Sequence, residues 1–406
     1  MYAAPNGSVR SGGRTARRAT TLRYAARQAR AGDVVCLLAG TYRLSEPLTI
    51  TLHGTRSAWI VFRSYGGRAT LTAARPLNAA LITVHDPGSY LQFSGLSFDG
   101  GTTRANEAVI LGHRVHHVRL IGNDIRNMSA AGLAALSTDY VTFAGNVIHR
   151  FGDGVGWSSG ISVNSDDGAV WADRAPGFHT VITGNVISGG VDNSAYHSDG
   201  NAIIVDLGGD IAPILIANNL AYENGGRCIE NKGVQHVWVV NNTCYKNGLD
   251  SRLGQVGEIQ NQDVEDVHLI NNVAVAWSNR YPYKTEQSVD VTFSHNVAFG
   301  GLPSIVPDDV VGNPAALRVA DPKFVNAPTV DPAADRQWQS APTNVGVAAR
   351  FRPAPGSPLL KWGVDPRAEP GVNQAYRSAL VRFLARDLSG NRRVTVGRPA
   401  VGAFNS

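Results

Sequence analysis

The chain has 406 residues, of which 43% are hydrophobic and 17% are charged, and its formal net charge is +5. This composition supports a large core and argues against a disordered chain. No apolar run reaches the ~18 residues of a membrane-spanning helix, and without finger spacing or a basic motif interleaved with aromatics we expect no nucleic-acid partner.

The N-terminal region is predicted to cap the fold. Residues 21–43 read TLRYAARQARAGDVVCLLAGTYR, which indicates an amphipathic helix, a Gly-Asp turn and a strand. A helix over a first coil would cover an open sheet edge, so we assign residues 1–45 to this cap. The arginines among the first 30 residues are either a solvated surface or an attraction for an acidic polymer.

One motif recurs along the middle of the chain and predicts coils of a parallel β-helix. An Asn recurs at intervals of 23 to 39 residues within apolar, alternating segments such as VRLIGNDI (118–125) and VTFSHNVA (291–298). The aligned positions are Asn123, Asn146, Asn185, Asn219, Asn242, Asn272 and Asn296. We expect each Asn to adopt the left-handed conformation of a corner and to stack in a structural ladder.

A second strand precedes each motif. These strands are EAVIL (107–111), GLAAL (132–136), GISVN (160–164), NAIIVD (201–206), RCIEN (227–231) and GEIQN (257–261). Every coil therefore has at least two strands, and we assign residues 46–305 to the coils. Residues 306–406 are Pro-rich, lack the Asn motif and are predicted to be an irregular C-terminal cap. The expected fold is all-β, a single right-handed parallel β-helix.

Several segments carry a family resemblance. YAAPNGS, AGDVVCLLAGTY, the GN and NN coils, DPKFV, PGSPLLKWG and GAFNS together resemble secreted right-handed parallel β-helix proteins, a group that contains polysaccharide lyases, glycoside hydrolases and uronate epimerases. The resemblance implies a carbohydrate-active enzyme with a polysaccharide substrate. We expect a monomer that is secreted or periplasmic, with a leader peptide outside this sequence. One fold hosts many reactions, so the reaction must come from the site.

The second strands predict where that site lies. If Ile203, Ile229 and Ile259 point inward, the period of two places Ile204, Glu230 and Gln260 outward. The same register makes neighbours of Asp206 and Lys232, with Glu258 one coil further on. The preceding turns add His197, Asp199, Asn201 and Arg227. We interpret this cluster as a functional site; the alternative is an ion-pair network on an exposed sheet.

The cluster fits β-elimination on a uronate polymer, the first function we consider. Elimination needs neutralisation of the substrate carboxylate, a base and an acid. On the family resemblance, CIENKG followed by Arg252 looks like the site of calcium-dependent β-helix lyases, with Lys232 as base, Arg252 as acid and Glu230 as a metal ligand. Possible Ca²⁺ ligands are Asp199, Asp206 and Glu230. The sequence departs from this pattern at Arg227 and Cys228, where a second acidic ligand is expected. The predicted catalytic set is Lys232, Arg227, Arg252, Asp206, Glu230 and Glu258.

Two other functions remain open. A glycoside hydrolase would use a carboxyl pair from the same cluster, or Asp166 and Asp167. A non-catalytic β-helix would only bind glycans. In each case the predicted substrate-binding residues are His197, Asp199, Asn201, Gln260, Trp157, Tyr196, Tyr222 and Lys284, the aromatic ones as platforms for sugar rings.

Two groups of residues are assigned no chemistry. His113, His116 and His117 are expected to decorate a loop. Among Cys36, Cys228 and Cys244 at least one thiol must be free; Cys228 and Cys244 could be neighbours, but we predict buried thiols.

Overall fold

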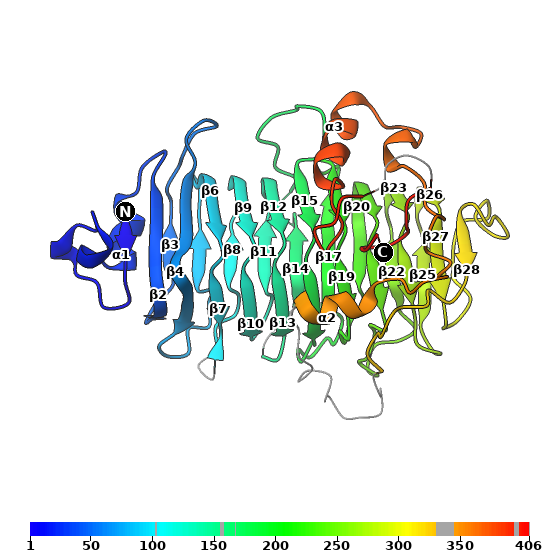
Figure 1. Ribbon diagram of the computed structural model, residues 1–406, viewed down its shortest axis with the longest axis horizontal. Helices are drawn as coiled ribbons and strands as arrows, with labels where there is room; N and C mark the ends of the chain where they lie inside the picture. Colours follow the sequence, from blue (N-terminus) through cyan, green and yellow to red (C-terminus); the bar gives the residue numbers. More distant parts are fainter. Residues whose placement is uncertain (102–103, 155–157, 167, 330–344, 394–397, 406) are drawn as a thin grey trace.

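The computed structural model describes residues 1–101, 104–154, 158–166, 168–329, 345–393 and 398–405. It confirms the parallel β-helix (Figure 1): all the interstrand ladders between named strands are parallel, and strands of successive coils stack along one long axis. Each complete coil contributes three strands, one to each of three stacked rows, so the coils have one strand more than the two that the sequence identified. None of the described helices is long and apolar enough to cross a membrane.

The three rows are defined by their pairing, and two strands, β2 and β4, pass from row 1 into row 2. Row 1 contains the first halves of β2 (Val34–Leu44) and β4 (Ile60–Ala73), then β6 (Ser89–Ser94), β9 (His116–Ile121), β12 (Asp139–Ala144), β15 (Thr180–Thr183), β18 (Ile214–Ala217), the second half of β20 (Ile229–Val240), β23 (Glu265–Ile270) and β26 (Val289–Ser294). Row 2 adds β7 (Ser97–Asp99), β10 (Asp124–Met128), β13 (Val147–Phe151), β16 (Val186–Gly190), β19 (Leu220–Tyr222), β21 (Thr243–Tyr245), β24 (Val273–Val275), β27 (Asn296–Phe299) and β28 (Leu317–Val319).

Row 3 carries the strands that precede each motif. It contains β3 (Leu48–Ile50), β5 (Ile82–Val84), β8 (Val109–Leu111), β11 (Leu133–Leu136), β14 (Ser159–Asn164), β17 (Asn201–Gly209), the first half of β20, β22 (Gly257–Gln262) and β25 (Tyr281–Glu286). Ile161, Ile203, Ile229 and Ile259 are paired in register and have no exposed surface. This confirms the inward column from which the outward side chains of the site were predicted.

The Asn ladder is confirmed at the corner between rows 1 and 2. The amide nitrogen of Asn185 donates to Oδ1 of Asn219 (2.9 Å), and that of Asn219 donates to Oδ1 of Asn242 (3.0 Å). All seven members are at most 2% exposed. The expected left-handed backbone belongs to the preceding residue instead, as at Gly184 (φ 66°) and Asn218 (φ 56°). The ladder Asn itself turns inward, because only there can its amide bond to the next coil.

The ends of the chain cover the coils. Helix α1 (Leu22–Gln28) packs on β1 (Tyr2–Ala3), β2 and β3, as expected for an N-terminal cap, although β2 already belongs to the first coil. Short 3₁₀ helices lie at Val9–Ser11, Ala16–Arg18, Ala349–Phe351 and Pro366–Ala368.

The C-terminal segment runs back along the coils (Figure 1). Helix α3 (Gln374–Phe383) packs through Leu380 on the outer side of row 1, beside Trp238. The segment with α2 (Val345–Ala348) packs through Phe351 on the outer side of row 2, beside Tyr222. These contacts cover rows 1 and 2, which leaves the outer side of row 3 as the place for the predicted site.

Two expectations about single residues are wrong. Cys228 and Cys244 form a disulfide with a Cα–Cα distance of 5.6 Å, while Cys36 is a buried free thiol. His116 and His117 belong to β9 rather than to a loop, and His117 stacks between Tyr90 and Tyr140 at ring-centroid distances of 4.4 and 4.3 Å. Stacked aromatic rings thus continue from coil to coil at this corner.

Candidate active site

A polar groove of about 340 Å³ lies on the outer side of row 3, over β14, β17, β20 and β22. Its ionisable lining residues are Asp166, Asp199, Asp206, Arg227, Glu230 and Lys232, and its other lining residues include Ser158, Ser159, Ser162, Asn164, Ser198 and Gln262. Five of these ionisable residues belong to the predicted cluster. The groove therefore brings together ionisable groups from three successive coils, those of β14, β17 and β20, and Gln262 from the next coil.

The strand register places Asp206 beside Lys232, as predicted. Asp206 pairs with Lys232 on one side and with Asn164 on the other, and Lys232 pairs with Gln262. Neighbouring strands lie about 4.8 Å apart. Lys232 is exposed, and within the described part of the chain no carboxylate lies within 4.0 Å of its ammonium group. It is therefore a cation that a substrate can reach.

Two carboxyl groups of the groove hold their protons more tightly than usual. Burial, and then the charges of Glu230, Asp192 and Asp206, raise the pKa of Asp199 to about 7. Burial and the charge of Glu230 raise the pKa of Asp206 to about 6, although Asn164 and Lys232 oppose the rise. Oδ1 of Asp206 is also buried without a hydrogen-bond partner among the described residues. Such groups are typical of sites that exchange protons with a substrate.

Glu230 is fixed in place by its neighbours. One of its carboxylate oxygens accepts a hydrogen bond from Nδ2 of Asn201 (2.9 Å), and the other lies 3.3 Å from Nε of Arg227. Arg227 in turn donates through Nη1 to the carbonyl of Ser198 (2.8 Å). The guanidinium group thus brings positive charge between the acids of the groove, where it also lowers the pKa of Asp199.

The turn that carries Asp199 is held from behind. Oδ2 of Asp192 accepts hydrogen bonds from the backbone N–H groups of Ser198 (2.8 Å) and Asp199 (3.0 Å). Arg252 donates to the Asp192 carbonyl (2.9 Å) and pairs closely with Asp250, which raises the pKa of Arg252. Arg252 is not among the lining residues of the groove, and a raised pKa opposes proton donation. The structure thus places Arg252 behind the turn, where it bonds to Asp192 and Asp250, and we do not assign it the role of acid.

Glu258 is also misplaced by the sequence interpretation. It is 2% exposed, and its two oxygens accept hydrogen bonds from the backbone and amide N–H groups of Asn247, both at 2.7 Å. It lies beside the Cys228–Cys244 disulfide. The alternation of inward and outward side chains breaks at the start of β22, so the consecutive residues Glu258 and Ile259 are both buried. Glu258 ends a second, buried amide ladder and does not face the groove.

The structure places the predicted substrate-binding residues in several different surroundings. Asn201 and Asp199 belong to the groove network, whereas Tyr222 is 1% exposed beneath Phe351 and is a core residue rather than a sugar platform. Tyr196 is 70% exposed on the turn, and the neighbouring His197 faces the Asp192 carbonyl (3.1 Å). Gln260 and Lys284 are aligned in register with Glu230 on the next two coils. Lys284 forms an ion pair with Glu286 (2.9 Å). Trp157 and Asp167 lie outside the described residues.

The sequence interpretation missed several polar residues that line the groove. Asn164 and Ser162 pair with Asp206 and Ile204, so the same register argument applied one coil earlier would have found them. Ser159 begins β14, while Ser158 and Ser198 lie outside the strands, where no periodic signal exists.

The comparisons with known proteins concern the fold. The chain folds like pectate lyase Pel9A. That likeness covers 100% of this chain and 96% of that one, with a TM-score of 0.56 and 18% sequence identity. An alginate lyase from Paenibacillus sp. str. FPU-7 (TM-score 0.50, 20% identity, 74% and 95% covered) and a GH136 lacto-N-biosidase from Eubacterium ramulus (0.51, 13%, 78% and 67%) are also similar. No protein-family model and no curated protein matches the chain. At these identities the likeness establishes the shared fold.

The predicted calcium ligands do not fit a metal ion as they are arranged. Among the described residues, the ligand atoms of Asp199, Asp206 and Glu230 do not gather within 4.8 Å of one another. Both oxygens of Glu230 are already engaged, by Asn201 and by Arg227. The one compact group of potential ligands contains the two bonded cysteines and Glu258, and disulfide sulfurs are not thiolate ligands. We therefore derive no step through a metal.

Proposed function

We propose that this protein is an exported carbohydrate-active enzyme that cleaves an acidic, uronate-containing polysaccharide by β-elimination. The observation that carries the proposal is a reachable cation, Lys232, in the same groove as Asp199, a carboxyl group with a pKa of about 7. A base and a protonated acid are the two proton-transferring groups that elimination requires. The fold shared with a pectate lyase and an alginate lyase supports the proposal.

The proposed reaction uses the groove residues as follows. Lys232 takes the proton on C5 of a uronate through the lone pair of its amine nitrogen. The C5–H electron pair forms a C4–C5 double bond as the C4–O bond breaks. Asp199 gives its proton to the departing oxygen. Arg227, held by Glu230 and Ser198, supplies positive charge for the substrate carboxylate.

Hydrolysis is the second candidate, and a specific observation favours it. Asp199 and Asp206 line one groove, and the pKa of each is raised, to about 7 and about 6. Two carboxyl groups that line one groove can act as acid and base towards a glycosidic bond. Asp199 would again be the acid, Asp206 would activate water, and Lys232 would only bind substrate.

Product analysis distinguishes these reactions. The protein is incubated with polygalacturonate, alginate and xylan, and both reducing ends and the ultraviolet absorbance of unsaturated ends are followed. We expect both signals from one of the two uronate polymers. Reducing ends without absorbance would mean hydrolysis, and neither signal with any polymer would leave a glycan-binding β-helix.

Variants test the role of Lys232. We expect Lys232→Ala to lower the elimination rate by about 10²–10⁴-fold, the usual contribution of a positioned acid or base. Lys323→Ala, at another exposed lysine that does not line the groove, is the matched control. An undiminished rate in Lys232→Ala would refute the assignment of the base.

A further inference from the structure

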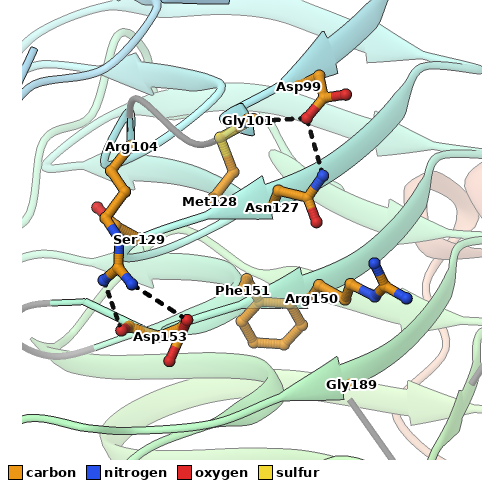
Figure 2. A pocket seen from close by; sticks show the side chains of 10 residues that line it. All are labelled: Asp99, Gly101, Arg104, Asn127, Met128, Ser129, Arg150, Phe151, Asp153 and Gly189. Atoms are coloured by element: carbon orange, nitrogen blue, oxygen red, sulfur yellow. Dashed lines mark hydrogen bonds and ion pairs between the residues drawn. The ribbon is translucent and has the colours of Figure 1, made fainter. Parts of the chain in front are cut away.

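A second cavity, larger than the groove, lies where several strands of row 2 end. Its volume is about 540 Å³, and it lies over the ends of β7, β10, β13 and β16. Its polar lining residues are Asp99, Arg104, Asn127, Ser129, Arg150 and Asp153. Figure 2 shows the Arg104–Asp153 pair on one side and the Asp99–Asn127 pair on the other.

The cavity exists because a column of corner side chains is interrupted. Asn127, Arg150 and Gly189 occupy equivalent corner positions on three successive coils, each with a positive φ (58°, 57° and 70°). Gly189 carries no side chain, so the column has a gap there before it resumes at Glu223 (φ 55°) on the next coil. Met128 and Phe151, each 1% exposed, close the floor. The walls are therefore polar and the floor is apolar.

The chemistry of the walls selects a class of ligand. Nη1 of Arg104 donates to the carbonyl of Asp153 (3.0 Å), and Asp99 accepts from Nδ2 of Asn127 (2.8 Å) and from Nε of Arg126 (2.9 Å). Two guanidinium groups and two carboxylates line the cavity, so their formal charges balance. A sugar hydroxyl both donates and accepts hydrogen bonds and matches such mixed walls. A compact anion such as phosphate would face the two carboxylates at a cost.

Two coils contribute residues to both this cavity and the groove. Strand β13 leads into β14, so that Asp153 lines the cavity while Ser158 and Ser159 line the groove. Strand β16 leads through the turn of Asp199 into β17. Asn193, in that turn, donates to Oδ1 of Asp153 (2.8 Å). The cavity wall and the turn that carries Asp199 are thus in direct contact.

We propose that this cavity is a second saccharide-binding site, which holds a hydroxyl-bearing sugar unit of the polymer that is cleaved in the groove. The inference rests on the proposed function for the identity of that polymer. The two sites lie on different rows of the helix, so the bound polymer either bends around the corner or carries a branch there.

The test separates binding from cleavage. Affinity gel electrophoresis with polygalacturonate, alginate and xylan is run in an Asp199→Asn background, because Asp199 is the acid of both proposed reactions and the polymers then stay intact. We expect Arg104→Ala to weaken binding of the polymer that the intact protein cleaves by about fivefold or more, as expected when a charged hydrogen-bond donor is lost. Arg68→Ala is the matched control, because Arg68 also forms an exposed ion pair, with Asp124 at 2.6 Å, but does not line the cavity. Equal thermal unfolding midpoints would show that both variants are folded.

Each outcome is decisive. Equal affinity of the Arg104→Ala and Arg68→Ala variants, or no binding of any of the three polymers, would overturn the second site while cleavage by the intact protein still supports the proposed function. Binding that depends on Arg104 without cleavage of any polymer would keep the saccharide site and overturn the enzyme.

Discussion

The protonation of Asp199 gives the most direct test of the groove, because both proposed reactions use it as the acid. Its pKa of about 7 arises first from burial and then from the charges of Glu230, Asp192 and Asp206. A group with that pKa is half protonated at pH 7 and about one-tenth protonated at pH 8. Where the base of the reaction is already free of its proton at pH 7, as Asp206 would be in hydrolysis, we therefore expect kcat/KM to fall about tenfold per pH unit above pH 7. If Asp206 must be ionised, kcat/KM also rises with pH through the Asp206 pKa of about 6. The plot of kcat/KM against pH is then a narrow bell-shaped curve.

The Asp199→Asn variant removes the proton but keeps the size and polarity of the side chain. We expect kcat/KM to fall by about 10²–10⁴-fold, and the decline above pH 7 to disappear because no group is left to titrate there. The assay is the initial rate of product formation between pH 5 and 9. Asp166→Asn, another acid of the same groove, is the control and should keep the decline. A decline near pH 7 that persists in Asp199→Asn would refute the assignment.

Four further predictions concern stability and metal dependence. The folded-state pKa of Asp199 exceeds its usual value of 3.8, so the folded form holds a proton that the unfolded chain releases; stability from this group is lost as pH rises from about 4 to 7, and Asp199→Asn should raise the unfolding midpoint at pH 8 but not at pH 4. Asn219→Leu removes four buried ladder hydrogen bonds and should lower the free energy of unfolding by about 3–6 kcal/mol in denaturant titrations, whereas substitution of the exposed Asn313 should change it little. Cys228 and Cys244 are 16 residues apart, so replacing both with Ala should cost about 3 kcal/mol, and reductant should then have no further effect on unfolding. Chelator should leave the cleavage rate unchanged, because both oxygens of Glu230 are engaged by protein groups; a rate lost with chelator and restored by Ca²⁺ would contradict this.

The regular parts of the coils were predictable because their signals repeat. The Asn recurrence fixed the ladder, and the aligned Ile residues fixed the register that makes neighbours of Asp206 and Lys232. A period of two is reliable only while the backbone stays extended. At the corner before β22 it does not, and Glu258 therefore points inward.

The turns and corners gave no comparable signal. Arg252 donates a hydrogen bond to the carbonyl of Asp192, 60 positions earlier in the chain, and no local sequence pattern predicts this contact. The cavity of Figure 2 depends on the missing side chain of Gly189 in a column that becomes visible only when three coils are superposed. The features that the sequence did not reveal thus lie where the periodic argument is weakest, at turns and corners where the backbone is irregular.

The charge balance of the groove links the acidity of the substrate to the protonation of its residues. Four acids (Asp166, Asp199, Asp206 and Glu230) and two cations (Arg227 and Lys232) line it, which gives a net charge of −2 when all are ionised. A polyanion would then be repelled. Below pH 6, where both Asp199 and Asp206 hold protons, the lining is neutral and the two cations can attract a uronate carboxylate. An acidic substrate therefore requires the raised pKa values of these two residues: the same burial that makes Asp199 an acid near neutral pH also removes the negative charge that would exclude the polymer.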